Sequence, residues 1–231
     1  MMAPVSDGCV HCNNGIHHTT TSTGRNLTYR KRWRRRGGDF PCCNTFTRPA
    51  GRNPPAGRRA KFADMDSPRR TLLVVYHSWT GSTEQMSRAV LRGAAQEPAV
   101  ATRLVHARDA GPDDLLAADG YVFATPENLA AIAGLMKDFF DRSYYAALDR
   151  LNGRPYAALV CAGSDGSNAA RQIARIATGW RLREIAPPLV VCTHAQTTEA
   201  ILAPKVVPAA ELARGEELGA AFATGLAMGA F

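Results

Sequence analysis

The sequence predicts an α/β domain in which a five-stranded parallel sheet lies between two layers of helices. From Thr71 onward, short apolar runs alternate with longer segments of helical periodicity, which is the pattern of parallel strands joined by crossover helices. Five such right-handed units suit an open sheet with helices on both faces. Ligands of these sheets bind where the strands end, so the loops that leave the strands are the informative ones.

The expected strands are short runs rich in β-branched, aromatic and other apolar residues, bounded by polar or small ones. In chain order they are Thr71–Tyr76, Thr102–His106, Gly120–Thr125, Tyr156–Ala162 and Leu189–Thr193. The helices between them are recognised by apolar residues that recur every three or four positions. We expect them at Ser82–Ala95, Pro112–Ala118, Leu129–Leu148, Asn168–Trp180 and Ala209–Met228.

The first 69 residues differ in character from the domain expected over residues 70–231. They have little apolar periodicity and are rich in Arg, Gly, Pro, Asn and Thr, so a basic, disordered tail is predicted. An alternative is that the natural chain starts at Met65 and that the upstream part reflects an over-long translation start. The run Tyr29–Arg36 could also form a patch for nucleic acid or another anionic surface.

The net charge of +8 comes from the first 70 residues and not from the domain. Residues 1–70 hold 14 Lys and Arg against four acidic residues, whereas residues 71–231 hold 14 against 16, a net charge of −2. A nearly neutral domain has no electrostatic footprint for nucleic acid, which is therefore an unlikely partner. No stretch approaches the ~18 apolar residues of a membrane helix and no secretion signal is present, so a cytoplasmic protein without membrane contact is expected.

Of the six cysteines, four lie in the tail, and the other two, Cys161 and Cys192, end apolar runs of the domain. Without a secretion signal, disulfides are not expected. A zinc site in the tail is an alternative, but the apolar residues that zinc knuckles carry between ligand pairs are missing, and no metal site is predicted. Its ligands would be Cys9, Cys12, His17, His18, Cys42 and Cys43. Cys161 ends an apolar strand, which favours a buried thiol over a nucleophile.

The first strand-end loop, from Ser78 to Thr83, is small, polar and rich in hydroxyl groups. Hydroxyls and backbone N–H groups at a helix N-terminus suit a doubly charged phosphate, and a glycine lets the backbone approach the anion. The candidate phosphate ligands are Ser78, Trp79, Thr80, Gly81, Ser82 and Thr83. The alternative is that Ser82 or Thr80 only caps the helix, with Glu84 or Gln85 completing a capping box.

This loop resembles that of the flavodoxin-like flavoproteins, which follows T/S-x-T-G-x-T, and every constrained position matches. The resemblance implies FMN, bound by its phosphate at this loop. The loop matches neither the dinucleotide fingerprint nor the P-loop, because it has no G-x-G-x-x-G and no Gly-Lys-Ser/Thr.

The second loop follows the strand that ends near Thr125. It is similar to the middle loop of the NAD(P)H:FMN oxidoreductase branch of this superfamily, in which T-P and a later K-x-F-x-D recur, here Lys137 to Asp141. By that resemblance the flavin-ring contacts are Thr125, Pro126, Glu127 and Asn128. A proline-stiffened turn with Asn128 as helix cap is the alternative. We interpret Lys137 and Asp141 as a surface ion pair rather than a catalytic pair.

The third loop follows the strand that ends at Ala162. In the family it flanks the other side of the flavin, which makes Gly163, Ser164, Asp165 and Gly166 the candidates, although Asp165 could equally be a plain turn residue. His77 and His194 also follow strands, where a histidine is more often a satisfied polar residue than a base.

The resemblance implies an oxidoreductase that passes electrons from NAD(P)H through FMN to a quinone, a flavin or another small acceptor. The alternatives are a flavodoxin-type electron carrier and a module that has lost FMN. Carriers are usually strongly acidic and this domain is not, so the enzyme is favoured. The helix expected at Leu129–Leu148 carries more bulky residues than one face can bury, which suggests a homodimer.

Overall fold

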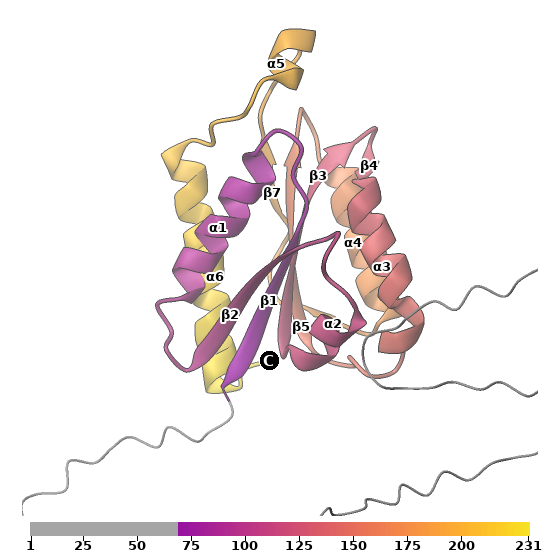
Figure 1. Ribbon diagram of the computed structural model, residues 1–231. Helices are drawn as coiled ribbons and strands as arrows, with labels where there is room; N and C mark the ends of the chain where they lie inside the picture. Colours follow the sequence, from indigo (N-terminus) through magenta and orange to yellow (C-terminus); the bar gives the residue numbers. More distant parts are fainter. Residues whose placement is uncertain (1–68) are drawn as a thin grey trace, which may run out of the picture. The chain divides into compact units, whose positions relative to one another are not determined.

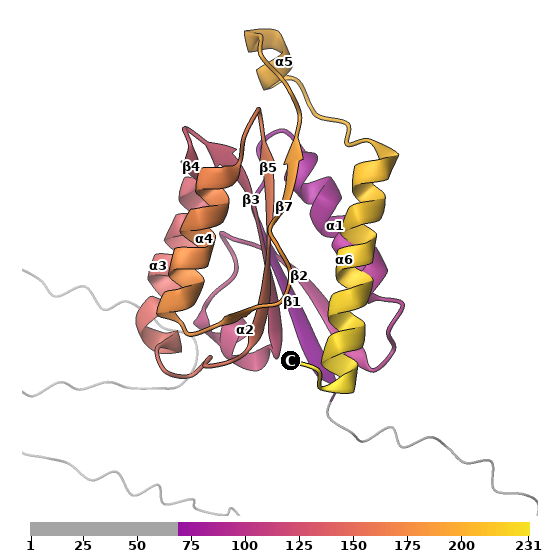
Figure 2. The same cartoon turned by 180° about the vertical axis from the view of Figure 1, so that it is seen from behind.

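Residues 69–231 are described by the computed structural model, and they form three layers (Figure 1). Helices α1 (Ser82–Ala94) and α6 (Ala209–Met228) cover one face of the sheet. The other face is covered by α2 (Pro112–Ala117), α3 (Gly134–Ala147) and α4 (Ser167–Gly179), as the view from behind also shows (Figure 2). The predictions about the tail, its basic run and its cysteines lie outside the described residues.

The five predicted strands are present and all run parallel. They are β1 (Arg70–Tyr76), β2 (Val100–His106), β3 (Gly120–Asn128), β5 (Pro155–Ala162) and β7 (Leu189–Cys192). Their order across the sheet is β2-β1-β3-β5-β7. The predicted fold class is therefore confirmed, but the strand count needs a correction to seven, because β4 (Ala131–Ile132) and β6 (Arg183–Glu184) add two short strands.

The edge of the sheet beyond β5 is interrupted. β6 pairs with the start of β5, with Tyr156 opposite Glu184, and β7 pairs with its end, with Leu159 opposite Leu189. The four residues 185–188 thus lie beside only two residues of β5. Pro187 and Pro188 fall in this segment and have no N–H to donate, so the ladder breaks there.

The core lies on both faces of the sheet because alternate strand residues point to opposite sides. On β1, Leu73 and Val75 pack with the α2, α3 and α4 layer, and Leu72 and Val74 pack with α1 and α6. Helices α1 and α6 approach closely at Gly219, where an added Cβ would lie 2.0 Å from a backbone oxygen of α1. Among residues 69–231, no helix combines the length and the apolar character that a membrane crossing requires.

The predicted helix at Leu129–Leu148 is wrong at its beginning. Leu129 and Ala130 both have positive φ, 52° and 56°, and form the tight turn of a hairpin between β3 and the antiparallel β4. Asn128 is the last residue of β3, so it does not cap α3, which starts at Gly134. No local pattern predicts this turn, because its two central residues are neither Asn nor Gly.

Candidate functional site

A cavity of about 710 Å³ opens at the carboxyl ends of the strands. Its wall combines the three predicted loops with the segment on either side of a short helix, α5 (Thr198–Leu202), that extends beyond the strand ends (Figure 1). Seven of the predicted site residues line it: Trp79, Thr80, Ser82, Pro126, Glu127, Asn128 and Gly163.

The first loop leads into α1 through Gly81, whose φ of 93° lies in the left-handed region that favours glycine. The Ser78 hydroxyl accepts a hydrogen bond from the Gly81 N–H at 3.1 Å. No side chain caps α1, so the alternative in which Ser82 or Thr80 serves as the cap is wrong. Thr80 and Ser82 line the cavity, and neither hydroxyl is engaged in capping the helix.

Thr83 carries the clearest sign of a missing partner. Its side chain is completely buried, and its Oγ1 has no hydrogen-bond partner within residues 69–231. A buried hydroxyl without a partner is costly, and native proteins keep few of them. It lies in the first turn of a 13-residue helix, where unpaired N–H groups and the helix dipole favour an anion. This part of the loop fits a phosphate group.

Cys161 lies at the end of β5 against this loop and lines the cavity. It is 3% exposed, which confirms the prediction of a buried thiol. Burial raises the pKa of the Cys161 thiol to about 11, and the neighbouring Thr83 and Ser82 hydroxyls only partly offset this. A thiol held in its neutral form is a poor nucleophile.

The second loop is tied to the third by Glu127. The carboxylate of Glu127 accepts hydrogen bonds from the N–H groups of Gly166, at 2.8 Å, and Ala169, at 3.4 Å. Glu127, which belongs to β3, thereby caps the N-terminus of α4. Thr125 is buried and does not line the cavity, because its Oγ1 donates to the Pro126 carbonyl and accepts from the Ala133 N–H.

Within the third loop, Gly163 alone reaches the cavity wall. Gly166 has a φ of 79°, and a Cβ there would lie 2.7 Å from the Val190 side chain, so both conformation and packing require glycine. Ser164 and Asp165 are exposed, and the Asp165 carboxylate accepts a hydrogen bond from Ser167 at 2.6 Å.

Sequence reasoning missed four cavity-lining residues in and around α5, namely Ala195, Ile201, Leu202 and Lys205. The Lys205 ammonium group donates hydrogen bonds to three carbonyls at the end of α5, at 2.5, 2.9 and 2.6 Å. A helix of five residues leaves almost no periodic signal, which is why the sequence did not reveal it.

His77 lies beside the first loop but outside the cavity wall. It is 3% exposed, and its Nδ1 is 3.1 Å from Nε2 of His106, while its Nε2 has no partner within the described chain. The expectation of a satisfied histidine therefore holds for one ring nitrogen only. Burial lowers the pKa of His77, and the positive charges of His106 and Arg108 lower it further. His194 is exposed, with a φ of 52°.

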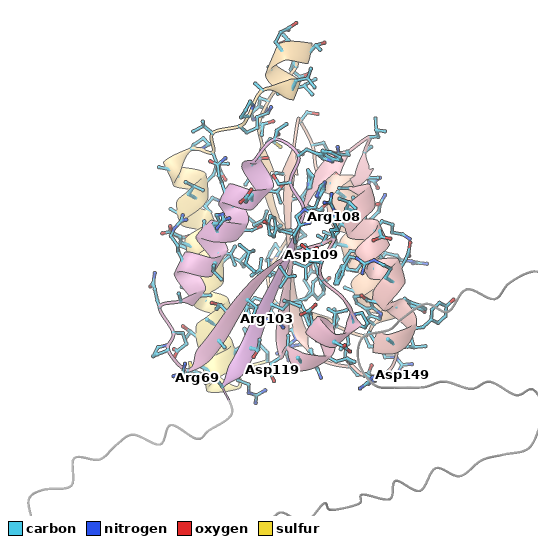
Figure 3. All side chains as sticks on the ribbon, in the orientation of Figure 1. Arg69, Arg103, Arg108, Asp109, Asp119 and Asp149 are labelled. Atoms are coloured by element: carbon cyan, nitrogen blue, oxygen red, sulfur yellow. The ribbon has the colours of Figure 1, made fainter. Side chains whose placement is uncertain are left out.

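Several charged side chains away from the cavity form surface ion pairs. Lys137 and Asp141 are 2.6 Å apart on α3 and exposed, which confirms the predicted surface ion pair. Arg69, Asp119 and Asp149 lie at the opposite end of the domain from α5 (Figure 3).

Residues 110–197 match the family model described as NADPH-dependent FMN reductase, which is less than half of the chain. Two curated proteins are also similar over part of the chain. A flavodoxin of Aquifex aeolicus is 37% identical over 70 residues, covering 30% of this chain and 38% of its own length. An NAD(P)H dehydrogenase (quinone) of Acidithiobacillus ferrooxidans is 35% identical over 92 residues, covering 31% and 46%. The chain thus spans less than half the length of these relatives.

Solved structures show the fold. A flavodoxin from the domain Archaea superposes with a TM-score of 0.57 at 20% identity, covering 68% of this chain and 98% of its own. A WrbA-like flavodoxin from Agrobacterium tumefaciens superposes with a TM-score of 0.53 at 19% identity, covering 69% and 98%. The domain is flavodoxin-like, and the resemblance to the FMN reductases that the loops predicted is confirmed by the sequence matches.

Proposed function

We propose that this flavodoxin-like domain binds FMN and acts as an NAD(P)H-dependent oxidoreductase with a small-molecule acceptor, a quinone being the best candidate. One observation carries the proposal. Helix α1 begins without a side-chain cap and holds the buried, unpartnered hydroxyl of Thr83, next to Ser82, which lines a cavity of about 710 Å³. That volume lies within the usual range for cofactor sites.

The residues around the cavity divide into two roles. The first loop would hold the phosphate through the hydroxyls of Ser78, Thr80, Ser82 and Thr83 and the N–H groups of α1. The ring contacts would come from Trp79, Pro126, Asn128 and Gly163, which line the same cavity. When bound, FMN supplies the hydride-accepting and electron-donating chemistry.

The chain's own contribution is to bind, orient and exclude water. Glu127 and Lys205 are the two charged residues in the cavity wall, and both form hydrogen bonds with backbone groups. Neither is placed to work as a free acid or base. The wall offers a ring-sized ligand mostly apolar and neutral surface, which is what an uncharged heterocycle prefers.

Apolar side chains also surround the mouth of the cavity. Trp79 is 68% exposed, Leu129 fully exposed and Leu202 73% exposed, and all three line the cavity. Such a rim favours an apolar acceptor, and the quinone dehydrogenase is among the similar proteins. The match to a flavodoxin keeps a second candidate, an electron carrier between proteins.

The test uses the whole chain loaded with FMN under anaerobic conditions. We expect NADPH or NADH to bleach the flavin absorbance within seconds, and a soluble benzoquinone to restore it. Flavin that binds but stays oxidised with both nucleotides, and that dithionite reduces in two separated steps, would favour the carrier. Failure to bind FMN would contradict both functions.

The oligomeric state is a separate part of the proposal. Met136, Phe139 and Phe140 of α3 are buried in the domain, whereas Tyr145 is 84% and Tyr144 38% exposed. We propose that these two tyrosines lie in a homodimer interface. Light scattering at micromolar concentration should give twice the mass of the chain, and a Tyr145→Lys variant should give the mass of a monomer.

A further inference from the structure

The side-chain amide of Gln85 joins two segments that line the cavity from different parts of the sequence. One is the phosphate loop, Ser78–Thr83, and the other is the α5 arm, which we define as residues 194–207. Nε2 of Gln85 donates to the Gly81 carbonyl at 3.0 Å and to the Lys205 carbonyl at 2.7 Å. Its Oε1 accepts from the Val207 N–H at 3.2 Å. Both ends of the amide are therefore engaged.

The α5 arm has few other attachments to the domain. The Lys205 N–H donates to the Thr80 carbonyl at 2.7 Å, which adds a second link to the phosphate loop. Helix α5 itself has no buried residue, and Ile201 and Leu202 are 52% and 73% exposed although they line the cavity. The arm joins the core at Val207, which is 5% exposed. Its position over the cavity thus depends on the contacts at Thr80, Gly81 and Gln85.

We propose that Gln85 is a positioning residue that couples the phosphate site to the α5 arm. A phosphate held by the first loop fixes the backbone of Thr80 and Gly81, and Gln85 passes that constraint to Lys205 and Val207. The wall formed by Ile201 and Leu202 then becomes ordered when the phosphate site is filled. This inference rests on the proposed FMN site.

The chemistry of the amide makes the coupling specific to glutamine. One group must donate twice and accept once, which an amide can do and a carboxylate cannot. Gln85→Glu keeps the acceptor for Val207 and loses both donors, whereas Gln85→Ala loses all three contacts. A purely structural role would weaken every ligand alike. Coupling through the phosphate site instead predicts different results for FMN and riboflavin, which differ only in the phosphate.

The experiment follows hydrogen exchange in the full chain with saturating FMN or riboflavin. In the wild-type protein, we expect FMN to slow exchange over residues 196–206 at least threefold more than riboflavin does. In Gln85→Ala and Gln85→Glu, the two flavins should protect the arm equally. Flavin fluorescence quenching gives the Kd of each flavin. In both Gln85 variants, the ratio of the riboflavin Kd to the FMN Kd should fall by about tenfold, which corresponds to about 1.4 kcal/mol.

Gln172→Ala is the matched control. The Gln172 side chain also holds a separate segment in place, because its Oε1 accepts a hydrogen bond from the Ile132 N–H in β4 at 3.2 Å. It should keep the phosphate-dependent protection of the arm. If Gln85→Ala fails to fold in a urea titration, Gln85→Glu carries the test.

Equal protection of the wild-type arm by riboflavin and FMN would overturn the inference, and so would full FMN-dependent protection in a folded Gln85 variant. Either result leaves the proposed function standing as long as FMN binds. A wild-type protein that binds neither flavin would overturn the proposed function itself, and the coupling with it.

Discussion

Replacing Thr83 by Val should move stability and cofactor affinity in opposite directions. Valine has nearly the same shape as threonine and removes only the hydroxyl, which is buried and lacks a partner in the described chain. If the hydroxyl is kept for the FMN phosphate, its loss helps the protein without cofactor and harms the complex. If Thr83 served packing alone, Thr83→Val would not combine a gain in stability with a loss of FMN affinity.

The size of each effect follows from hydrogen-bond energetics. An unsatisfied buried polar group costs about 1–3 kcal/mol, so Thr83→Val should stabilise the cofactor-free protein by about 1–2 kcal/mol. For a domain of this size, that raises Tm by about 2–8 °C. A hydrogen bond to a charged group contributes about 1.5–3 kcal/mol, so the Kd for FMN should rise about ten- to hundredfold.

Thermal unfolding of the cofactor-free protein and fluorescence titration with FMN measure the two quantities independently. Ser87→Ala is the control, since Ser87 is one turn further along α1, equally buried, and its hydroxyl already donates to the Thr83 carbonyl at 2.7 Å. It should lose about 1 kcal/mol of stability and leave FMN affinity within about twofold. A Thr83→Val protein with lowered Tm and unchanged FMN affinity would refute the assignment of Thr83 to the phosphate.

Three further predictions address the fold and the groups around the site. Because the pKa of His77 is lowered on folding, the domain should be most stable above the ordinary histidine pKa of 6.5 and lose stability as the pH falls below it. In urea unfolding, His77→Gln should make the midpoint depend less on pH. Gly219→Ala should destabilise the domain by about 1–3 kcal/mol in urea unfolding, because its Cβ would meet α1 at 2.0 Å, whereas Gly179→Ala, with open space, should not destabilise it. With iodoacetamide at pH 8, peptide mapping should show Cys192, which is partly exposed, modified well before Cys161, whose pKa is about 11.

The sheet and the phosphate loop could be predicted from the sequence because their signals are local. Each of the five parallel strands corresponds to a short, mostly apolar stretch of sequence. All five were predicted to within three residues at either end. The Ser78–Thr83 loop carries its chemistry in consecutive residues directly after a strand. Where a structure depends on neighbouring residues alone, the pattern is sufficient.

The parts that were missed depend on contacts between distant residues. Glu127 lines the cavity as part of the second loop, but the contact of its carboxylate with the start of α4, some forty residues along the chain, was not predicted. The turn at Leu129 and Ala130 is stabilised by the pairing of β3 with β4, although neither residue favours positive φ. The Lys205 carbonyl accepts a hydrogen bond from the Gln85 side chain across 120 residues. No local pattern records such contacts.

The charges near the cavity help to explain how a dianion and a neutral ring could share one site. Lys205 could have balanced a phosphate, yet its ammonium group lies on the carbonyls that end α5, and the Glu127 carboxylate lies on the N–H groups that begin α4. Although both residues line the cavity, each charge is thus engaged at a helix end. The phosphate is left to hydroxyls and to the N-terminus of α1, which provide partial positive charge without a mobile cation. Removing the Lys205 charge should therefore disturb the arm more than the phosphate site, and a Lys205→Met variant that lost FMN affinity as severely as Thr83→Val would contradict this division of roles.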